Sequence, residues 1–312
     1  MRALTGRDLR GAGKFLYLCR RDWDLLLIIS LPFAYYILFR YLPMYGIVLA
    51  FKDFSVRKGI LGSPWVGLKW FDQFFSSPYF FRLLRNTFLL SVYTIIFSFP
   101  VPIIFAILLS EIRHRWYQRF AQTASYLPYF ISMVVAMGMV VNFLNPEEGV
   151  VNILLGKLGI APVDFMNTAR WFRSVYVVSG IWQTFGFNAI LYLAAITSID
   201  VQLFEAATMD GATRLQKIRY ITIPCITSTI VILLILNLGN MLNVGFEKII
   251  LLYTPATYET GDVISTYVYR RGILENNFGF GTAVGLFNSV INLALIYVFN
   301  RVARKLSDVS LW

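Results

Sequence analysis

The sequence predicts an all-α integral membrane protein with six transmembrane helices, and two observations support this fold class. The 312 residues are 57% hydrophobic and only 14% charged, whereas a soluble domain has about 25% charged residues. In addition, six long stretches contain no Asp, Glu, Lys or Arg: 25–39, 86–110, 120–146, 174–199, 220–246 and 276–300. Each stretch must be helical, because lipid offers the backbone no other hydrogen-bond partners.

The first of these stretches differs from the others in length. The other five exceed the roughly 20 residues that cross a hydrocarbon core, but this one has only 15. We expect one helix from about Leu25 to about Tyr41, with the Arg40 side chain reaching the headgroups at the far interface. The alternative interpretation is that Arg40 is a buried functional charge.

Basic residues at the ends of the predicted spans indicate the orientation of the chain. Six spans place both termini on one side, and span ends on that side carry Arg20, Arg21, Arg113, Arg115 and Arg301. Because positive residues beside spans mark the cytoplasmic side, we expect both termini in the cytoplasm. The chain then consists of a cytoplasmic arm (1–24), a transmembrane domain (25–302) and a cytoplasmic tail (303–312). The formal charge of +11 does not indicate nucleic-acid binding, because Lys and Arg occur in short clusters between apolar stretches.

The predicted outer loop, residues 50–85, is rich in aromatic residues. It contains Trp65, Trp70, Phe71, Phe74 and Phe75. Because aromatic side chains such as Trp are enriched at the level of the lipid headgroups, we interpret this loop as an interfacial aromatic belt.

The cytoplasmic segment between the fourth and fifth spans, residues 200–224, is the most informative part of the sequence. Asp200 can cap a short helix, because its carboxylate can accept from the exposed first-turn amides. Gly211 then permits a sharp turn without a Cβ penalty, and Pro224 lies where the chain re-enters the membrane. We therefore expect a helix–turn–helix on the inner face, which is either a docking element or an ordinary amphipathic loop.

This segment resembles the EAA loop of bacterial ABC-importer permeases. The pattern is Glu205-Ala206-Ala207, three residues, Gly211, nine residues, and then an Ile-x-Ile-Pro string that ends at Pro224. The departure from the family pattern is Ile223, where Leu is usual. The resemblance implies that Glu205, Ala206, Ala207, Asp210 and Gly211 form the elbow that docks into an ATP-binding subunit.

Other strings are similar to the carbohydrate-uptake branch of this family. Residues 65–71 resemble the F-V-G-L-x-N-F element of that branch, with Trp70 in place of Asn. The Asn86-Thr87 pair and the string Trp182-Gln183 with Gly186 are also similar to its elements. The strings 41–46 and 310–312 resemble a narrower group that handles complex oligosaccharides and includes the first permease subunit of alginate importers. The resemblance implies the type I ABC importer permease fold and an oligosaccharide substrate, with an alginate-derived or other uronate-rich one as the best guess.

The resemblance also implies a set of partners. These are a second, non-identical permease subunit, two ATP-binding subunits and an extracytoplasmic solute-binding protein, in a bacterial cytoplasmic membrane. The chain itself has no G-x-x-x-x-G-K-[ST] loop, so ATP and Mg²⁺ are expected to bind in the partner ATPase subunits. We expect no cofactor, metal site or catalytic residue in this chain.

Uncharged polar residues inside the spans are the candidates for a substrate pathway, because polar groups are costly in lipid without partners. Asn237, Asn240 and Asn243 cover an arc of about 120° on the fifth span at 100° per residue. The fourth span contributes Trp182, Gln183 and Asn188. The sixth span has a stripe of Gly281, Gly285, Asn288 and Asn292, which is also a pattern of helix packing. Pathway lining and helix packing remain alternatives for these residues.

Two other classes of function compete with a permease. An intramembrane glycan- or lipid-modifying enzyme would need catalytic carboxylates or a metal site, and the charge-free stretches contain no such group. An ion-coupled secondary transporter usually needs buried ionisable groups, and Arg40 is the candidate nearest to a span. Both alternatives are therefore less consistent with the sequence than the permease.

Overall fold

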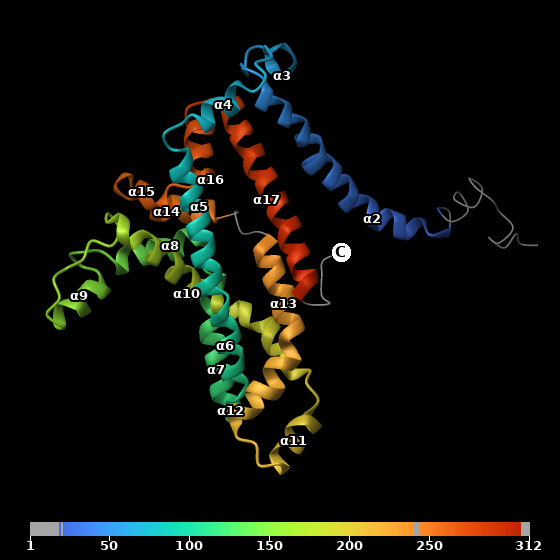
Figure 1. Ribbon diagram of the computed structural model, residues 1–312, viewed down its shortest axis with the longest axis vertical. Coiled ribbons are helices and arrows are strands. Elements are labelled where there is room, and N and C mark those ends of the chain that lie inside the picture. The colour runs from blue at the N-terminus through green and yellow to red at the C-terminus, as the bar shows by residue number, and fades with distance from the viewer. Residues whose placement is uncertain (1–18, 20, 240–243, 307–312) are drawn as a thin grey trace, which may run out of the picture.

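The computed structural model describes residue 19, residues 21–239 and residues 244–306. In this part of the chain every regular element is helical, apart from one isolated antiparallel bridge between Lys52 and Trp65. The long helices stand side by side in an elongated bundle, with α3 and α4 at one end and α11 and α12 at the other (Figure 1). The predicted all-α class is confirmed.

Among the described residues, five helices are long and apolar enough to cross a membrane, and a sixth crossing exists if a bent helix pair counts as one span. The five are Trp23–Phe51, Phe80–Ser110, Ala169–Thr197, Arg214–Leu238 and Phe278–Val298. They contain, in order, α2 (Trp23–Tyr36), α5 (Phe80–Tyr93) with α6 (Pro100–Ser110), α10 (Ala169–Thr197), α13 (Ile223–Gly239) and α17 (Phe278–Leu306).

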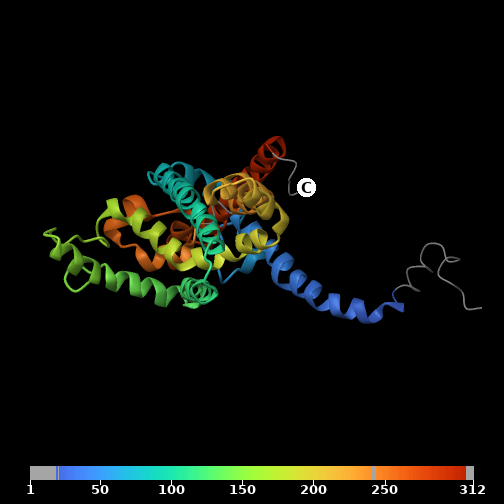
Figure 2. The same ribbon diagram turned by 90° about the horizontal axis from the view of Figure 1, so that it is seen from below.

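The first span is longer than predicted. α2 continues through a π-helical turn, η1 (Ile37–Tyr41), into a 3-10 segment, η2 (Leu42–Phe51). The helix continues past Tyr41 because Leu42–Phe51 is wholly apolar and Pro43 occupies a first-turn position, where proline is tolerated. Arg40 therefore lies within the helix and not at its end, which corrects the predicted boundary. α2 leaves the bundle and has no buried residue (Figures 1 and 2).

The third predicted span, residues 120–146, is not one straight helix. α7 (Arg115–Tyr126) and η4 (Leu127–Phe130) are followed by α8 (Met133–Phe143), and the two parts meet at a bend of 102°. Pro128 lacks an amide donor and begins the 3-10 turn, and Ile131 is extended. Ser132 then caps the new helix, because its side chain accepts a hydrogen bond from the Val135 amide.

The aromatic outer loop folds onto the bundle instead of forming an interfacial belt. Trp70 and Phe74 of α4 (Lys69–Phe75) are only 6% and 1% exposed, and they pack with Phe280 of α17. The Trp70 indole donates to the backbone oxygen of Lys52. The belt interpretation is wrong for these two side chains, although Trp65 remains exposed.

The two glycines of the stripe on the sixth span, Gly281 and Gly285, have different surroundings. A Cβ at Gly281 would lie 2.9 Å from the Gly272 Cα, so this glycine serves close packing, whereas a Cβ at Gly285 would meet nothing within 4 Å. Asn292 has an interaction partner. The packing alternative therefore holds for Gly281 and not for Gly285.

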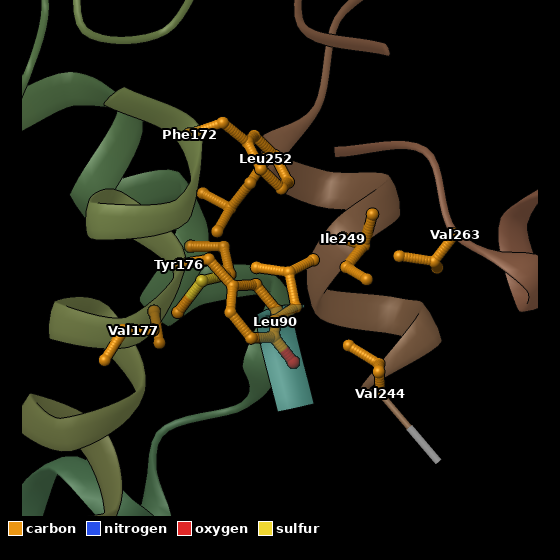
Figure 3. Packing of buried hydrophobic residues seen from close by; sticks show 10 residues of the cluster. Leu90, Phe172, Tyr176, Val177, Val244, Ile249, Leu252 and Val263 are labelled. Atoms are coloured by element: carbon orange, nitrogen blue, oxygen red, sulfur yellow. The ribbon is translucent and has the colours of Figure 1, made fainter. Parts of the chain in front are cut away.

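Short helices connect the long ones. They are α3 (Gly59–Gly62), α9 (Val150–Lys157), α14 (Phe246–Leu252), α15 (Tyr258–Gly261) and α16 (Ile264–Val268), with turns η6 (Pro255–Thr257) and η7 (Tyr269–Leu274). α14 packs against α10 through a buried apolar cluster in which Tyr176 and Phe172 face Ile249 and Leu252 (Figure 3). This contact holds α14 beside the bundle at the level of the candidate site.

Candidate functional site

A cavity of about 350 Å³ lies between α5–α6, α10, α13 and α14; we call it the central cavity. Its polar lining residues are Thr94, Ser98, Tyr176, Gln183, Thr184, Asn188, Tyr192, Asn237 and Lys248. The volume is within the range of small-molecule sites in proteins. Because amides, hydroxyls and aromatic rings line it together, the central cavity suits a polar ligand with apolar faces.

α10 forms one wall of the central cavity with a single face of the helix. Tyr176, Gly180, Thr184 and Asn188 follow one another at intervals of four residues, and Gln183 lies beside them. Residues four apart share a face of an α-helix. α10 is one continuous helix from Ala169 to Thr197. The four-residue spacing therefore places these residues along one side of the helix.

The predicted pathway residues separate into three groups. Gln183, Asn188 and Asn237 line the central cavity. Trp182 instead lines a second, apolar pocket with Phe143 and Trp171, and Asn288 lines neither pocket. Asn240 and Asn243 lie outside the described residues.

Gln183 has an unused hydrogen-bond acceptor. Its amide nitrogen donates to the backbone oxygen of Ile131 at 3.3 Å, at the bend between η4 and α8. Its Oε1 atom is buried and has no hydrogen-bond partner in the described part of the chain. Since buried polar atoms are usually paired, this oxygen is an unsatisfied acceptor on a residue that lines the central cavity.

Lys248 of α14 is a lining residue that sequence reasoning missed. It follows the fifth charge-free stretch by two positions, so the sequence pattern indicates a loop residue outside the spans. The fold turns α14 back against α10 and buries the lysine, so that 6% of the residue is exposed. Burial lowers the pKa of its ammonium to about 7, because desolvation disfavours the charged form.

At the far end of the bundle, residues 200–224 form the predicted helix–turn–helix. Asp200 caps α11 (Val201–Met209) by accepting from the Gln202 amide at 2.9 Å. Gly211 has φ +76°, in the left-handed region that favours glycine. α12 (Arg214–Lys217) follows and begins with a capping box of Thr213 and Gln216.

The elbow between α11 and α12 is held together by a side-chain hydrogen bond and is open to its surroundings. The Lys217 ammonium donates to the Thr208 hydroxyl at 2.7 Å and ties the two helices together. Glu205 and Ala206 are exposed, Ala207 is half-buried, and Met209 is 88% exposed. A Cβ at Gly211 would meet nothing within 4 Å. The elbow therefore presents small, acidic and apolar groups that the described part of the chain leaves uncovered.

Comparison with known proteins identifies the family of the chain. The family model described as binding-protein-dependent transport system inner membrane component matches residues 98–308. The polygalacturonan/rhamnogalacturonan transport system permease protein YteP of Bacillus subtilis is 42% identical over 278 residues, which are 89% of this chain and 87% of that protein.

Two solved structures have the same fold as this chain. One is the crystal structure of a bacterial ABC transporter involved in the import of the acidic polysaccharide alginate. Its matching chain has a TM-score of 0.88 and 43% identity, over 94% of this chain and 99% of that one. The other is a bacterial alginate ABC transporter in complex with an alginate pentasaccharide-bound periplasmic protein. It has a TM-score of 0.87 and 42% identity, over 94% and 98% of the two chains.

Proposed function

The chain belongs to the family of binding-protein-dependent transport system inner membrane components, and we propose that it forms half of the pathway for an oligosaccharide in an ATP-driven importer. The observation that carries this proposal is the exposed elbow at one end of the bundle. An ordered element with exposed apolar groups is suited to dock onto another subunit.

The elbow docks into an ATP-binding subunit through Glu205, Ala206, Ala207, Asp210 and Gly211. Small residues let a partner backbone approach closely, and Glu205 and Asp210 offer carboxylates to partner cations or amides. Two ATP-binding subunits close on ATP and draw two such elbows together, one from this chain and one from a second, non-identical permease. The spans then rock between inward-open and outward-open arrangements.

The central cavity carries the sugar between these arrangements. Gln183, Asn188 and Asn237 bind hydroxyl groups through their amides, and the largely buried Tyr176 and Tyr192 form part of the wall beside them. An external binding protein delivers the sugar. This step is supported by the similar transporter, whose solved structure is a complex with a pentasaccharide-bound periplasmic protein. The substrate class is an acidic oligosaccharide, supported by the polygalacturonan and alginate that similar transporters carry.

The test of coupling uses two glycines in the same conformation. Gly211 and Gly159 both follow a helix, have positive φ (+76° and +75°) and donate to the carbonyl oxygen three residues earlier. Proline can neither adopt this φ nor donate. We expect Gly211→Pro to lower sugar uptake in proteoliposomes at least about tenfold, which corresponds to roughly 1.4 kcal/mol. The stimulation of ATPase activity by the loaded binding protein should fall by the same factor. Glu205→Ala should have the same two effects.

Gly159→Pro is the matched control, because it places the same strain after α9, away from the elbow. We expect it to retain coupled transport. Unchanged coupling in both Gly211→Pro and Glu205→Ala would remove the docking role from the elbow. Uptake that persists without the ATP-binding subunits would instead favour a secondary transporter.

A further inference from the structure

Lys248 is a buried cation in the wall of the central cavity, and the function proposed above does not use it. Its ammonium donates a hydrogen bond to the backbone oxygen of Tyr176 and lies 4.4 Å from the centroid of the Tyr176 ring. The Tyr176 hydroxyl in turn accepts from the Gly245 amide at 3.2 Å, which holds the start of α14 in place. The position of the ammonium is therefore set by both α10 and α14.

No carboxylate of the described residues forms a salt bridge with Lys248. Arg270, which is partly buried, has the counter-charge that Lys248 lacks. Its guanidinium pairs with the fully buried Asp262 carboxylate at 2.7 Å. A lysine ammonium has three donors, and a buried charge without a counter-charge is costly. Lys248 therefore has unused capacity for an anion.

Lys248, Gly180 and Gln183 all line the central cavity, so an anion in the cavity would lie beside the lysine. A Cβ at position 180 would lie 2.6 Å from the Lys248 Nζ atom, so Gly180 is what makes space for the ammonium on α10. Gln183, one turn further along the same face, carries the buried Oε1 without a partner. A cation and a free amide oxygen on one wall are complementary to a carboxylate and a hydroxyl of the same ligand.

We propose that Lys248 binds the carboxylate of an acidic sugar residue in the central cavity and makes the cavity selective for uronate-containing oligosaccharides. This inference rests on the proposed function, since it assumes that sugar passes through the cavity. The ammonium forms a charge-assisted hydrogen bond to the carboxylate, while Gln183 and Asn188 bind neighbouring hydroxyls. A carboxylate of the second permease is the competing anion, and the experiment distinguishes the two.

The complete importer, with its partner subunits and binding protein, is reconstituted in proteoliposomes. ATP-dependent uptake is measured for a uronate oligosaccharide and for its carboxyl-reduced, neutral counterpart of equal length. The variants are Lys248→Gln, which keeps a donor for the Tyr176 oxygen but removes the charge, and Lys248→Arg, which keeps the charge. Lys157→Gln, at an exposed lysine of α9, is the matched control.

We expect Lys248→Gln to lower uptake of the uronate oligosaccharide at least about tenfold, which corresponds to roughly 1.4 kcal/mol, because the variant loses a charge-assisted hydrogen bond. Uptake of the neutral sugar should stay within about twofold of the wild type, a difference below 0.5 kcal/mol. Lys248→Arg should preserve a preference for the acidic sugar, and Lys157→Gln should change neither rate.

Equal loss of both uptakes in Lys248→Gln would overturn the inference, because it would show a structural role or a pair with a partner carboxylate. Unchanged uptake of both sugars would overturn it as well. If the wild-type importer takes up neither sugar with ATP, the proposed function fails, and the inference fails with it.

Discussion

At the residue scale, Asn86 holds three segments together that are far apart in the sequence. Its amide nitrogen donates to the backbone oxygens of Glu259 and Asp262, and its amide oxygen accepts from Arg173 at 3.1 Å. The neighbouring Thr87 hydroxyl accepts from the Ile264 amide. The Asn86-Thr87 pair, noticed in the sequence as a resemblance, thus joins α5 to α10 and to the α15–α16 connection.

Replacing Asn86 with alanine should destabilise the chain. Asn86 is fully buried, so Asn86→Ala leaves two carbonyl oxygens and the Arg173 guanidinium without their partner, at a cost of about 2–3 kcal/mol. Thermal unfolding of the purified protein in detergent should show a lower midpoint. Asn167→Ala, at an exposed asparagine, should leave the midpoint unchanged, and equal midpoints for both variants would contradict this role.

At the element scale, the bent pair of α7–η4 and α8 depends on α10 for support. A Cβ at Gly186 of α10 would lie 2.1 Å from the backbone oxygen of Ser125 in α7. The Gln183 side chain of α10 reaches Ile131 at the bend. The bend is therefore kept at a fixed position relative to the wall of the central cavity.

A methyl group at Gly186 should separate α10 from α7. Because Ser125 contributes backbone that cannot rotate away, we expect Gly186→Ala to cost about 1–3 kcal/mol, as overpacking does. Gly138→Ala is the control on α8, since a Cβ there meets nothing within 4 Å. Thermal midpoints of the two variants provide the comparison, and a loss in Gly138→Ala alone would refute the close contact.

At the scale of the whole molecule, the two ends of the bundle have different surfaces. The aromatic cap of α4 and the exposed α3 lie at one end, and the α11–α12 elbow lies at the other (Figure 1). The positive charges beside the spans predict that the elbow lies on the cytoplasmic side. α2, apolar on all sides and without a buried residue, has its whole surface left for lipid or a partner.

The orientation can be tested with single cysteines at the two ends. In a background where Cys19 and Cys225 are replaced by serine, Leu61→Cys and Met209→Cys introduce thiols at positions that are 82% and 88% exposed. A membrane-impermeant maleimide added to intact spheroplasts should label Leu61→Cys only. Permeabilised cells should label both, and the reverse pattern in intact cells would invert the topology.

The sequence by itself determined what depends on local composition and on neighbours within a few turns. Charge-free length predicted the helical spans, because lipid leaves the backbone no other choice. Asp200 and Gly211 predicted the elbow, because caps and left-handed turns depend on the residues beside them. The polarity of Gln183 and Asn188 within a charge-free stretch marked both as pathway candidates, because polar groups are costly in lipid without partners.

Only the tertiary structure decided which polar groups meet. Trp182 is next to Gln183 in the sequence, yet it lines a different pocket, because adjacent residues point about 100° apart on a helix. Trp70 and Phe74 became core because the outer loop folds back onto α17. Lys248 became a cavity residue because α14 packs against α10, a contact between segments 72 positions apart. Such long-range contacts depend on how whole helices pack, which no local pattern in the sequence specifies.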